Sequence, residues 1–178
     1  MQEQKKIVLI GYMASGKTVI GKQLAVKLKI PFIDLDDYIA EKEQLSIPEI
    51  FKKRGELHFR KLEFKYLKKL LDKKENFVLS VGGGTPTVSE VIELINKKAL
   101  SVYLQASVQT LYDRLVISDT VKRPLLTQIS TDFLKDYIVM HLLKRNVFYN
   151  QADKIVTVDG LSIEEIVTEI ISKTVYSK

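Results

Sequence analysis

The chain has 178 residues, 46% of them hydrophobic, which predicts one compact domain over residues 1–178 and argues against disorder. Its 28 basic and 22 acidic residues leave a net charge of +6, too mild and too evenly spread to indicate nucleic-acid binding. The absence of cysteine from the sequence excludes disulfides, thiolate metal sites and a cysteine nucleophile. The first apolar run, Ile7–Ile10, is too short for a signal peptide or a membrane span, so we expect a cytoplasmic protein.

Apolar runs and helical spacing predict strands that alternate with helices along the chain. Ile20, Leu24 and Leu28, for example, recur every fourth residue after the first apolar run. In chain order we predict a strand at Lys5–Ile10, a helix at Lys17–Leu28, a strand at Pro31–Asp34, a helix at Ile50–Leu71, strands at Phe77–Val81 and Ala99–Leu104, helices at Val108–Ile117 and Thr131–Tyr149, a strand at Ile155–Val158, and a helix at Ser162–Val175 with Ser162 as its N-cap. This alternation is typical of an α/β fold in which helices cover both faces of a mainly parallel, five-stranded sheet.

The segment Gly11–Thr18 matches the eight-residue P-loop pattern and stands where that pattern has meaning, after a strand and before a helix. Glycine lets the N–H groups of such a loop turn inward around phosphate oxygens, and the helix end adds positive potential. Lys17 would then reach the outer phosphates of a nucleotide, and the Thr18 hydroxyl would bind Mg²⁺. The alternative is a glycine turn that leaves Lys17 exposed.

Three acidic residues, Asp34, Asp36 and Asp37, follow the second predicted strand. If the chain stays extended there, Asp34 and Asp36 point the same way, because they are two residues apart. One carboxylate could then hold Mg²⁺ while the other orients an acceptor hydroxyl. The alternative is that Asp36 or Asp37 caps a helix that begins before Tyr38.

Two further features indicate a ligand at this edge of the sheet. Gly82, Gly83 and Gly84 end the third predicted strand and would let a ligand approach the backbone closely, although they could also form a wide turn. Arginine is much scarcer than lysine, so it is a candidate for sites that need a planar fork for carboxylate or phosphate, although each arginine could also be a solvated charge. The arginines are Arg54, Arg60, Arg114, Arg123 and Arg145.

Taken together, these motifs resemble those of the shikimate kinase family, from about Ile7 to Asp153. The likeness rests on the loop Gly11–Thr18 with Gly21, the Asp34-Leu35-Asp36 step, Gly55-Glu56-Leu57-His58-Phe59-Arg60, the triple glycine, Arg123-Pro124-Leu125-Leu126, and Arg145 four residues before Tyr149. The resemblance implies a three-layer α/β/α P-loop kinase fold with a mobile lid at about residues 118–130. It also implies that ATP phosphorylates a ring hydroxyl of shikimate to give shikimate 3-phosphate and ADP, in the pathway to chorismate and aromatic amino acids.

The resemblance also assigns roles to residues of this sequence. Lys17, Asp36 and Arg123 would be catalytic, with Asp36 as the base. Thr18 and Asp34 would hold Mg²⁺. ATP would be bound by Ala14, Ser15, Gly16, Lys17, Thr18, Val19, Arg114 and Arg123, and shikimate by Asp36, Arg60, Gly82, Gly83, Gly84 and Arg145.

The sequence departs from the family pattern at two places. Ala14 stands where many members have glycine, and the segment Val158-Asp159-Gly160-Leu161 lacks a basic residue that some members place near adenine.

Two other functions stay open at this point. The chain could be another P-loop small-molecule kinase, acting on gluconate or a nucleoside monophosphate, or a nucleotide-binding module without catalysis. The expected partners are ATP and shikimate, with neither nucleic acid nor membrane, and we expect a monomer. The lysines between Lys61 and Lys74 alternate with leucines, which is typical of a solvated helix face.

Overall fold

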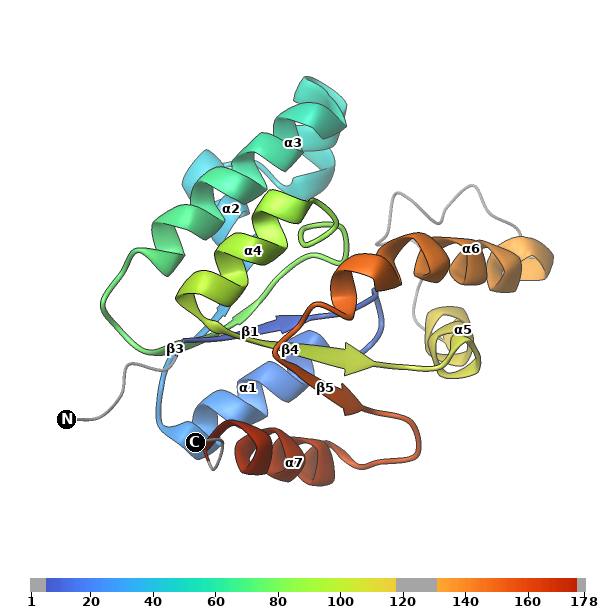
Figure 1. The fold of residues 1–178 in the computed structure, drawn as a ribbon. Coiled ribbons are helices and arrows are strands. Elements are labelled where there is room, and N and C mark those ends of the chain that lie inside the picture. The colour runs from blue at the N-terminus through green and yellow to red at the C-terminus, as the bar shows by residue number, and fades with distance from the viewer. Residues whose placement is uncertain (1–5, 118–130, 176–178) are drawn as a thin grey trace.

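The computed structural model describes residues 6–117 and 131–175 (Figure 1). Within these residues, five parallel strands form one sheet in the order β2-β3-β1-β4-β5, which confirms the predicted fold class. The strands are β1 (Lys6–Ile10), β2 (Phe32–Asp34), β3 (Phe77–Ser80), β4 (Leu100–Gln105) and β5 (Lys154–Thr157). Because the strands are parallel, their carboxyl ends meet at one edge, where ligands of such sheets bind.

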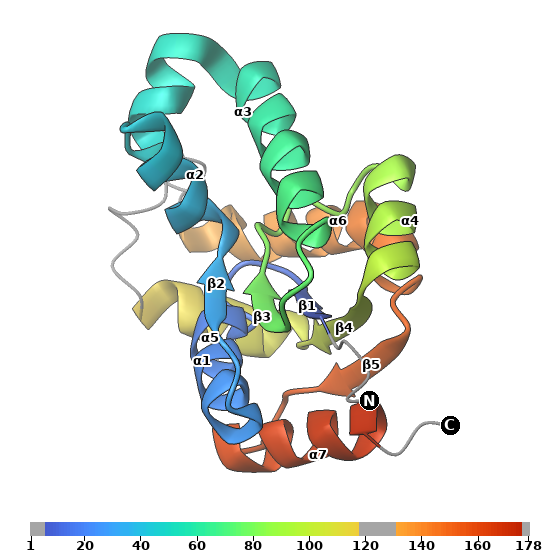
Figure 2. The same ribbon diagram turned by 90° about the vertical axis from the view of Figure 1, so that its left-hand side faces the viewer.

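Helices cover both faces of this sheet (Figures 1 and 2). One face carries α1 (Lys17–Leu28) and α7 (Ile163–Val175), which pack against each other. The other face carries α3 (Ile47–Leu71) and α4 (Ser89–Lys98), while α2 (Leu35–Glu43) packs on α3. Helices α5 (Val108–Ile117) and α6 (Thr131–Tyr149) pair with each other beyond the end of β4.

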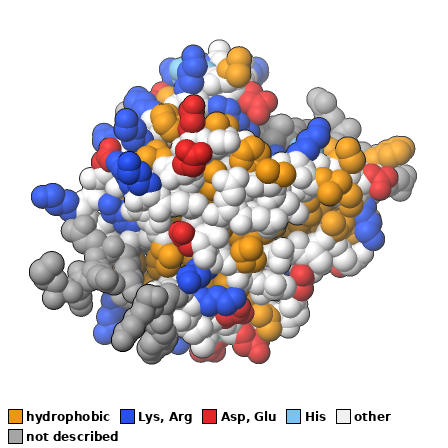
Figure 3. All heavy atoms as spheres, viewed as in Figure 1, with side chains coloured by type: hydrophobic (Ala, Val, Ile, Leu, Met, Phe, Trp, Pro, Cys, Tyr) orange, Lys and Arg blue, Asp and Glu red, His pale blue; other side chains and the backbone are white. Residues whose placement is uncertain are grey.

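The central strand β1 is buried on both of its faces. Ile7, Val8, Leu9 and Ile10 are at most 1% exposed, as the unbroken apolar run predicts for a strand between two helical layers. The α3 lysines Lys61, Lys65, Lys68 and Lys69 are exposed, so the prediction of a solvated face is confirmed. Figure 3 shows lysine and arginine side chains projecting from the surface with acidic side chains among them.

Of two further helices, α2 corresponds to the alternative prediction of a helix near Tyr38, with Asp34 rather than Asp36 or Asp37 as its cap, and α4 was not predicted. Helix α2 begins directly after β2, because the Asp34 side chain accepts a hydrogen bond from the Asp36 amide at 3.1 Å and so caps the helix. The expectation of an extended chain from Asp34 to Asp36 is therefore wrong. Helix α4 is a short helix whose buried face is formed by Val91, Ile92 and Ile95.

Helix α3 begins three residues earlier than expected and is broken in its first half. Ser46 and Glu49 form a capping box at its start, which the sequence analysis overlooked. Gly55 has a φ of 78°, a left-handed value that interrupts the helix and divides it into two parts, as its course in Figure 2 shows. The second part carries Arg60 toward the sheet.

Most of the remaining helices and strands begin and end close to their predicted positions. Helices α1, α5 and α6 have the predicted bounds, and no strand end differs from its predicted position by more than one residue. Ser162 caps α7 as predicted, because its hydroxyl accepts the Glu165 amide at 3.3 Å. The expected lid, residues 118–130, lies outside the described residues, and Arg123 lies outside them too. Among the helices that are described, none has the length and apolar character needed to cross a membrane.

Candidate active site

A cleft with a volume of about 570 Å³ lies at the carboxyl ends of β1, β2 and β3. Its walls come from the loop before α1, the start of α1, the start of α2, both parts of α3, the loop after β3, and α6. The expected site residues that line it are Ala14, Gly16, Lys17, Thr18, Val19, Asp34, Asp36, Arg60, Gly82, Gly83, Gly84 and Arg145. Ser15 and Arg114 are not among the lining residues.

The phosphate loop is shaped by two glycines in left-handed conformations. Gly11 has a φ of 148° and Gly16 a φ of 100°. A methyl group added to Gly11 would lie 2.8 Å from the Leu104 carbonyl oxygen, which rules out any larger residue without a shift of the backbone. The loop therefore turns tightly against β4 before α1 begins at Lys17.

The Lys17 side chain is buried, whereas the alternative prediction of a simple glycine turn would leave it exposed. It is 9% exposed, and its ammonium donates hydrogen bonds of 2.9 Å to the carbonyl oxygens of Gly11 and Tyr12. These bonds hold a positive charge at the mouth of the loop, beside the first amide groups of α1. Such an arrangement attracts anions, because the charge adds to the helix dipole.

The loop contains Ala14 in a left-handed conformation, and a hydrogen bond from Arg114 supports the backbone at this position. Ala14 has a φ of 63°, a left-handed value that costs a residue other than glycine roughly 1 kcal/mol. Its carbonyl oxygen accepts a hydrogen bond of 3.1 Å from Nη1 of Arg114 on α5. Arg114 thus fixes the outside of the loop.

The Ser15 hydroxyl is buried beneath the loop and has no hydrogen-bond partner among the described residues.

The side chains of Thr18 and Asp34 meet at the start of α1. The Thr18 hydroxyl donates to Oδ2 of Asp34 at 3.0 Å, while Oδ1 of Asp34 caps α2. Both side chains line the cleft and offer only oxygen atoms, the ligands that Mg²⁺ prefers. The pair therefore has the donor chemistry that a magnesium ion requires.

Asp36 faces a strongly perturbing environment in the first turn of α2. Burial raises the pKa of its carboxyl group from 3.8 to about 7, and the negative charges of Glu63 and Asp34 act in the same direction. Lys17 and Arg60 oppose the rise. Its Oδ1 is buried without a hydrogen-bond partner among the described residues. A carboxyl group with a pKa near neutrality is suited to exchange a proton with a substrate hydroxyl.

Two arginines from different helices approach the cleft on the far side of Asp36. Arg60 forms ion pairs with Glu63 at 2.5 Å and with Glu56 at 3.0 Å, the first of them buried on the glutamate side. Arg145 on α6 lies over the Tyr12 ring, with its guanidinium carbon 5.1 Å from the ring centre. Its Nη1 is buried and has no hydrogen-bond partner within residues 6–117 and 131–175.

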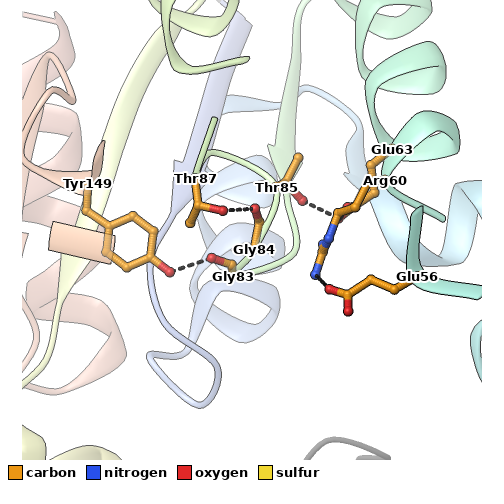
Figure 4. A network of polar contacts seen from close by, with 8 residues as sticks. All are labelled: Glu56, Arg60, Glu63, Gly83, Gly84, Thr85, Thr87 and Tyr149. Atoms are coloured by element: carbon orange, nitrogen blue, oxygen red, sulfur yellow. Dashed lines mark hydrogen bonds and ion pairs between the residues drawn. The ribbon is translucent and has the colours of Figure 1, made fainter. Parts of the chain in front are cut away.

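The triple glycine passes between these arginines, and each of its residues lies so close to a neighbouring group that there is little room for a side chain. An added methyl group would lie 3.0 Å from a Glu63 oxygen at Gly82, 3.3 Å from Nη1 of Arg145 at Gly83, and 2.8 Å from the Arg60 guanidinium at Gly84. Figure 4 shows the polar contacts that run through this segment from α3 to α6. Backbone, rather than side chain, therefore forms this part of the cleft wall.

Glu63 is a site residue that the sequence analysis missed. It is 2% exposed, and burial raises the pKa of its carboxyl group, while the Arg60 charge and the Thr85 hydrogen bond oppose the rise. A signal was present in the sequence, because Glu63 interrupts the apolar face formed by Phe59, Leu62 and Tyr66. A charged residue in such a stripe is rarely buried without a partner.

The parallel sheet, the glycine loop that opens α1 and the cleft beside it define a P-loop kinase with an α/β fold. A family model described as shikimate kinase matches residues 13–175. The shikimate kinase of Flavobacterium psychrophilum is 44% identical over 167 residues, 93% of this chain and 96% of that protein. The shikimate kinase of Aquifex aeolicus is 38% identical over 93% of this chain and 94% of its own length.

Solved structures agree with this assignment. The crystal structure of shikimate kinase from Bacteroides thetaiotaomicron has a TM-score of 0.87 and 38% identity over 94% of this chain and 97% of its own. Shikimate kinase from Acinetobacter baumannii, solved in complex with shikimate, has a TM-score of 0.86 and 29% identity, covering 96% and 93% of the two chains. The chain belongs to the shikimate kinase family, and it is an enzyme that phosphorylates shikimate with ATP.

Proposed function

We propose that the cleft transfers the terminal phosphoryl group of ATP to the 3-hydroxyl of shikimate, and that the residues lining it divide this task. The observation that supports the proposal best is a pair of buried polar atoms without partners among the described residues, Oδ1 of Asp36 and Nη1 of Arg145. Both residues line the cleft. Buried polar atoms without partners are costly, and a ligand with a hydroxyl and a carboxylate would supply the missing contacts.

The phosphate loop binds ATP in this proposal. The backbone of residues 14–19 surrounds the phosphates, and Lys17 exchanges its bonds to the loop carbonyls for bonds to phosphate oxygens. Arg114 holds the Ala14 carbonyl oxygen at the outside of the loop, and its place near the adenine of ATP rests on the family resemblance. The role of Arg123 on the phosphates rests on its sequence motif alone.

Thr18 and Asp34 would hold Mg²⁺, together with phosphate oxygens and water. When bound there, the ion neutralises charge that develops on the phosphates. The chain itself contributes a helix end and two oxygen-bearing side chains that are already in contact.

Asp36 receives the acceptor hydroxyl of shikimate. Its carboxyl group can accept the hydroxyl hydrogen bond when ionised, and a pKa of about 7 lets it take up the proton near neutral pH. Phosphoryl transfer depends little on a base, so the main contribution of Asp36 is to orient the oxygen toward the phosphate.

Arg60 and Arg145 bind the carboxylate of shikimate in this proposal. They come from α3 and α6, so the carboxylate links two sides of the cleft, while Gly82–Gly84 allows the ring to lie against backbone. Two planar guanidinium groups select a carboxylate over a neutral sugar hydroxyl.

The described strands form one sheet with the cleft at its edge, so we further propose that residues 1–178 are a single domain and that the protein is a monomer. A reaction that consumes ATP is consistent with a cytoplasmic location.

The decisive experiment measures ATP consumption with shikimate, quinate, gluconate and a panel of nucleoside monophosphates, with Mg²⁺ present. We expect turnover with shikimate well above every other acceptor, and ³¹P–¹H correlation spectra that place the phosphate on the 3-hydroxyl. An analogue in which an amide replaces the carboxylate should bind weakly to the parent enzyme. Turnover with gluconate or a monophosphate instead would identify a different P-loop kinase, and no turnover at all would indicate a nucleotide-binding module.

A further inference from the structure

The glycine segment that forms part of the cleft wall has no side chains with which to fix its own position. Its anchors must come from neighbouring residues, and Figure 4 shows where they lie. On the α3 side, the Thr85 hydroxyl donates to Glu63 at 2.5 Å. Within the segment, the Thr87 hydroxyl and amide both donate to the Gly84 carbonyl, at 2.7 and 3.2 Å.

On the α6 side, the anchor is Tyr149, whose hydroxyl donates to the Gly83 carbonyl oxygen at 2.5 Å. The tyrosine ring is fully buried and packs against Tyr103 at 5.0 Å between ring centres. Burial raises the pKa of the hydroxyl to about 12, so it keeps its proton and acts as a donor at neutral pH. Tyr149 does not line the cleft, so its effect on a ligand must pass through its neighbours, the Gly83 backbone and the Arg145 guanidinium, which lowers the pKa of the Tyr149 hydroxyl.

Gly83 is a sensitive point for such an anchor. Its Cα faces three groups at once, because an added methyl would lie 3.3 Å from Arg145 Nη1, from the Gly11 carbonyl oxygen and from the Met13 amide. Tyr149 stands one helical turn after Arg145 on the same face of α6. One turn of α6 therefore carries both Arg145, which lines the cleft, and Tyr149, which hydrogen-bonds to the Gly83 backbone beside it.

We propose that Tyr149 is a positioning residue for shikimate, which holds the Gly83 backbone in register with Arg145 through its hydrogen bond to the Gly83 carbonyl. This inference rests on the proposed function, because it names a residue that sets the affinity of the same cleft for its acceptor. Tyr149 touches neither substrate, and the phosphate loop keeps its own anchors at Lys17 and Arg114. We therefore expect the effect to fall mainly on the acceptor side, although Gly83 also lies close to the Gly11 carbonyl oxygen and the Met13 amide of the phosphate loop.

The test compares Tyr149→Phe with the matched control Tyr103→Phe. Both side chains are buried tyrosines in contact with each other, but the Tyr103 hydroxyl donates to Asn146 and does not reach the glycine segment. We expect Tyr149→Phe to raise the KM for shikimate roughly 3- to 10-fold, the loss for one neutral hydrogen bond. The KM for ATP and kcat should stay within about twofold, because binding rather than transition-state contact is lost.

A second measurement needs no substrate. In the protein without ligands, Tyr149→Phe should speed the hydrogen exchange of the Thr85 and Thr87 amides, which bond to the Gly82 and Gly84 carbonyls, whereas Tyr103→Phe should not. Urea unfolding checks that both variants are folded. Tyr149→Met, which also lacks the hydroxyl, replaces Tyr149→Phe if that variant does not fold.

An unchanged KM for shikimate in a folded Tyr149 variant would overturn the proposal, and so would an equal rise in Tyr103→Phe. A wild-type enzyme that does not use shikimate would instead overturn the proposed function, and the exchange rates would still show whether Tyr149 fixes the segment.

Discussion

Replacing Asp36 with asparagine should make the ligand-free protein more stable, by an amount that depends on pH. The Asp36 carboxyl group is partly buried near Glu63 and Asp34, and its pKa is raised from 3.8 to about 7 in the folded protein. In the unfolded chain the carboxylate ionises freely. Folding therefore works against ionisation of this residue at every pH above about 4.

The size of the effect follows from the two pKa values. Because the folded pKa is the higher one, the contribution of Asp36 to stability is fully present below pH 3.8 and is lost as the pH rises through 7. The loss amounts to about 1.5 kcal/mol at pH 5 and about 4 kcal/mol at pH 8.5, an upper limit since solvent reaches part of the side chain. Asparagine cannot ionise, so Asp36→Asn should gain these amounts.

The assay is urea unfolding followed by circular dichroism at pH 5 and pH 8.5. The control is Asp37→Asn, which removes a neighbouring acid that is exposed in the same turn of α2. We expect the stability gain of Asp36→Asn to be about 2.5 kcal/mol larger at the higher pH, and that of the control to be nearly constant. Equal gains at the two pH values would refute the reasoning, because the carboxyl group would then not titrate near neutrality in the folded state.

Four further variants test the division of roles in the cleft. Lys17→Ala should abolish most phosphoryl transfer and cost about 1 kcal/mol of stability, because two bonds to loop carbonyls are lost; an unchanged rate at saturating ATP would contradict the role of the loop. Asp34→Asn should raise the Mg²⁺ concentration needed for half-maximal activity while still capping α2, which a magnesium titration and thermal unfolding would check. Arg60→Lys should weaken shikimate binding by about 10- to 150-fold, the value of 1.5–3 kcal/mol for a charge-assisted bond, with ATP binding unchanged in calorimetry. Glu63→Gln should move the acid limb of kcat/KM for shikimate to lower pH, because one negative charge that raises the Asp36 pKa is removed; a limb that stays in place would show that Glu63 does not act on Asp36.

The parts of the fold that were predicted correctly are those dictated by neighbouring residues. The run Ile7–Ile10 and the stripe on α1 depend only on apolar spacing, and Gly11–Thr18 depends on glycine at set positions. The helix α2 was only an alternative prediction, and its cap was assigned to Asp36 or Asp37, because one side chain decides where it begins: Asp34 was assigned to a metal, whereas in the structure it also caps the helix. A short helix such as α4 gives too few turns for its period to stand out.

The contacts of the site were harder to predict because they join residues far apart in the chain. Arg60 and Arg145 stand on α3 and α6, and only the packed fold brings both to the Gly82–Gly84 segment. Glu63 interrupts an apolar helix face and Tyr149 follows Arg145 in a motif, but neither pattern says which group lies opposite the side chain. A sequence motif therefore identified the groups that could touch a ligand, but not the residues that hold them.

The cleft holds buried carboxyl groups whose ionisation is unfavourable, and hydrogen bonds from a substrate would lower that cost. Asp36 and Glu63 are both carboxyl groups with raised pKa values, and Arg60 is shared between Glu63 and Glu56. A cost of up to about 4 kcal/mol at one residue is large beside the 5–15 kcal/mol by which most domains are stable. The protein tolerates this free-energy cost because polar groups that already had partners in the free protein could not bind a ligand as well. In the proposed function, Oδ1 of Asp36 gains a partner when the substrate hydroxyl binds, and the Asp36→Asn variant would lose this interaction as it gains stability.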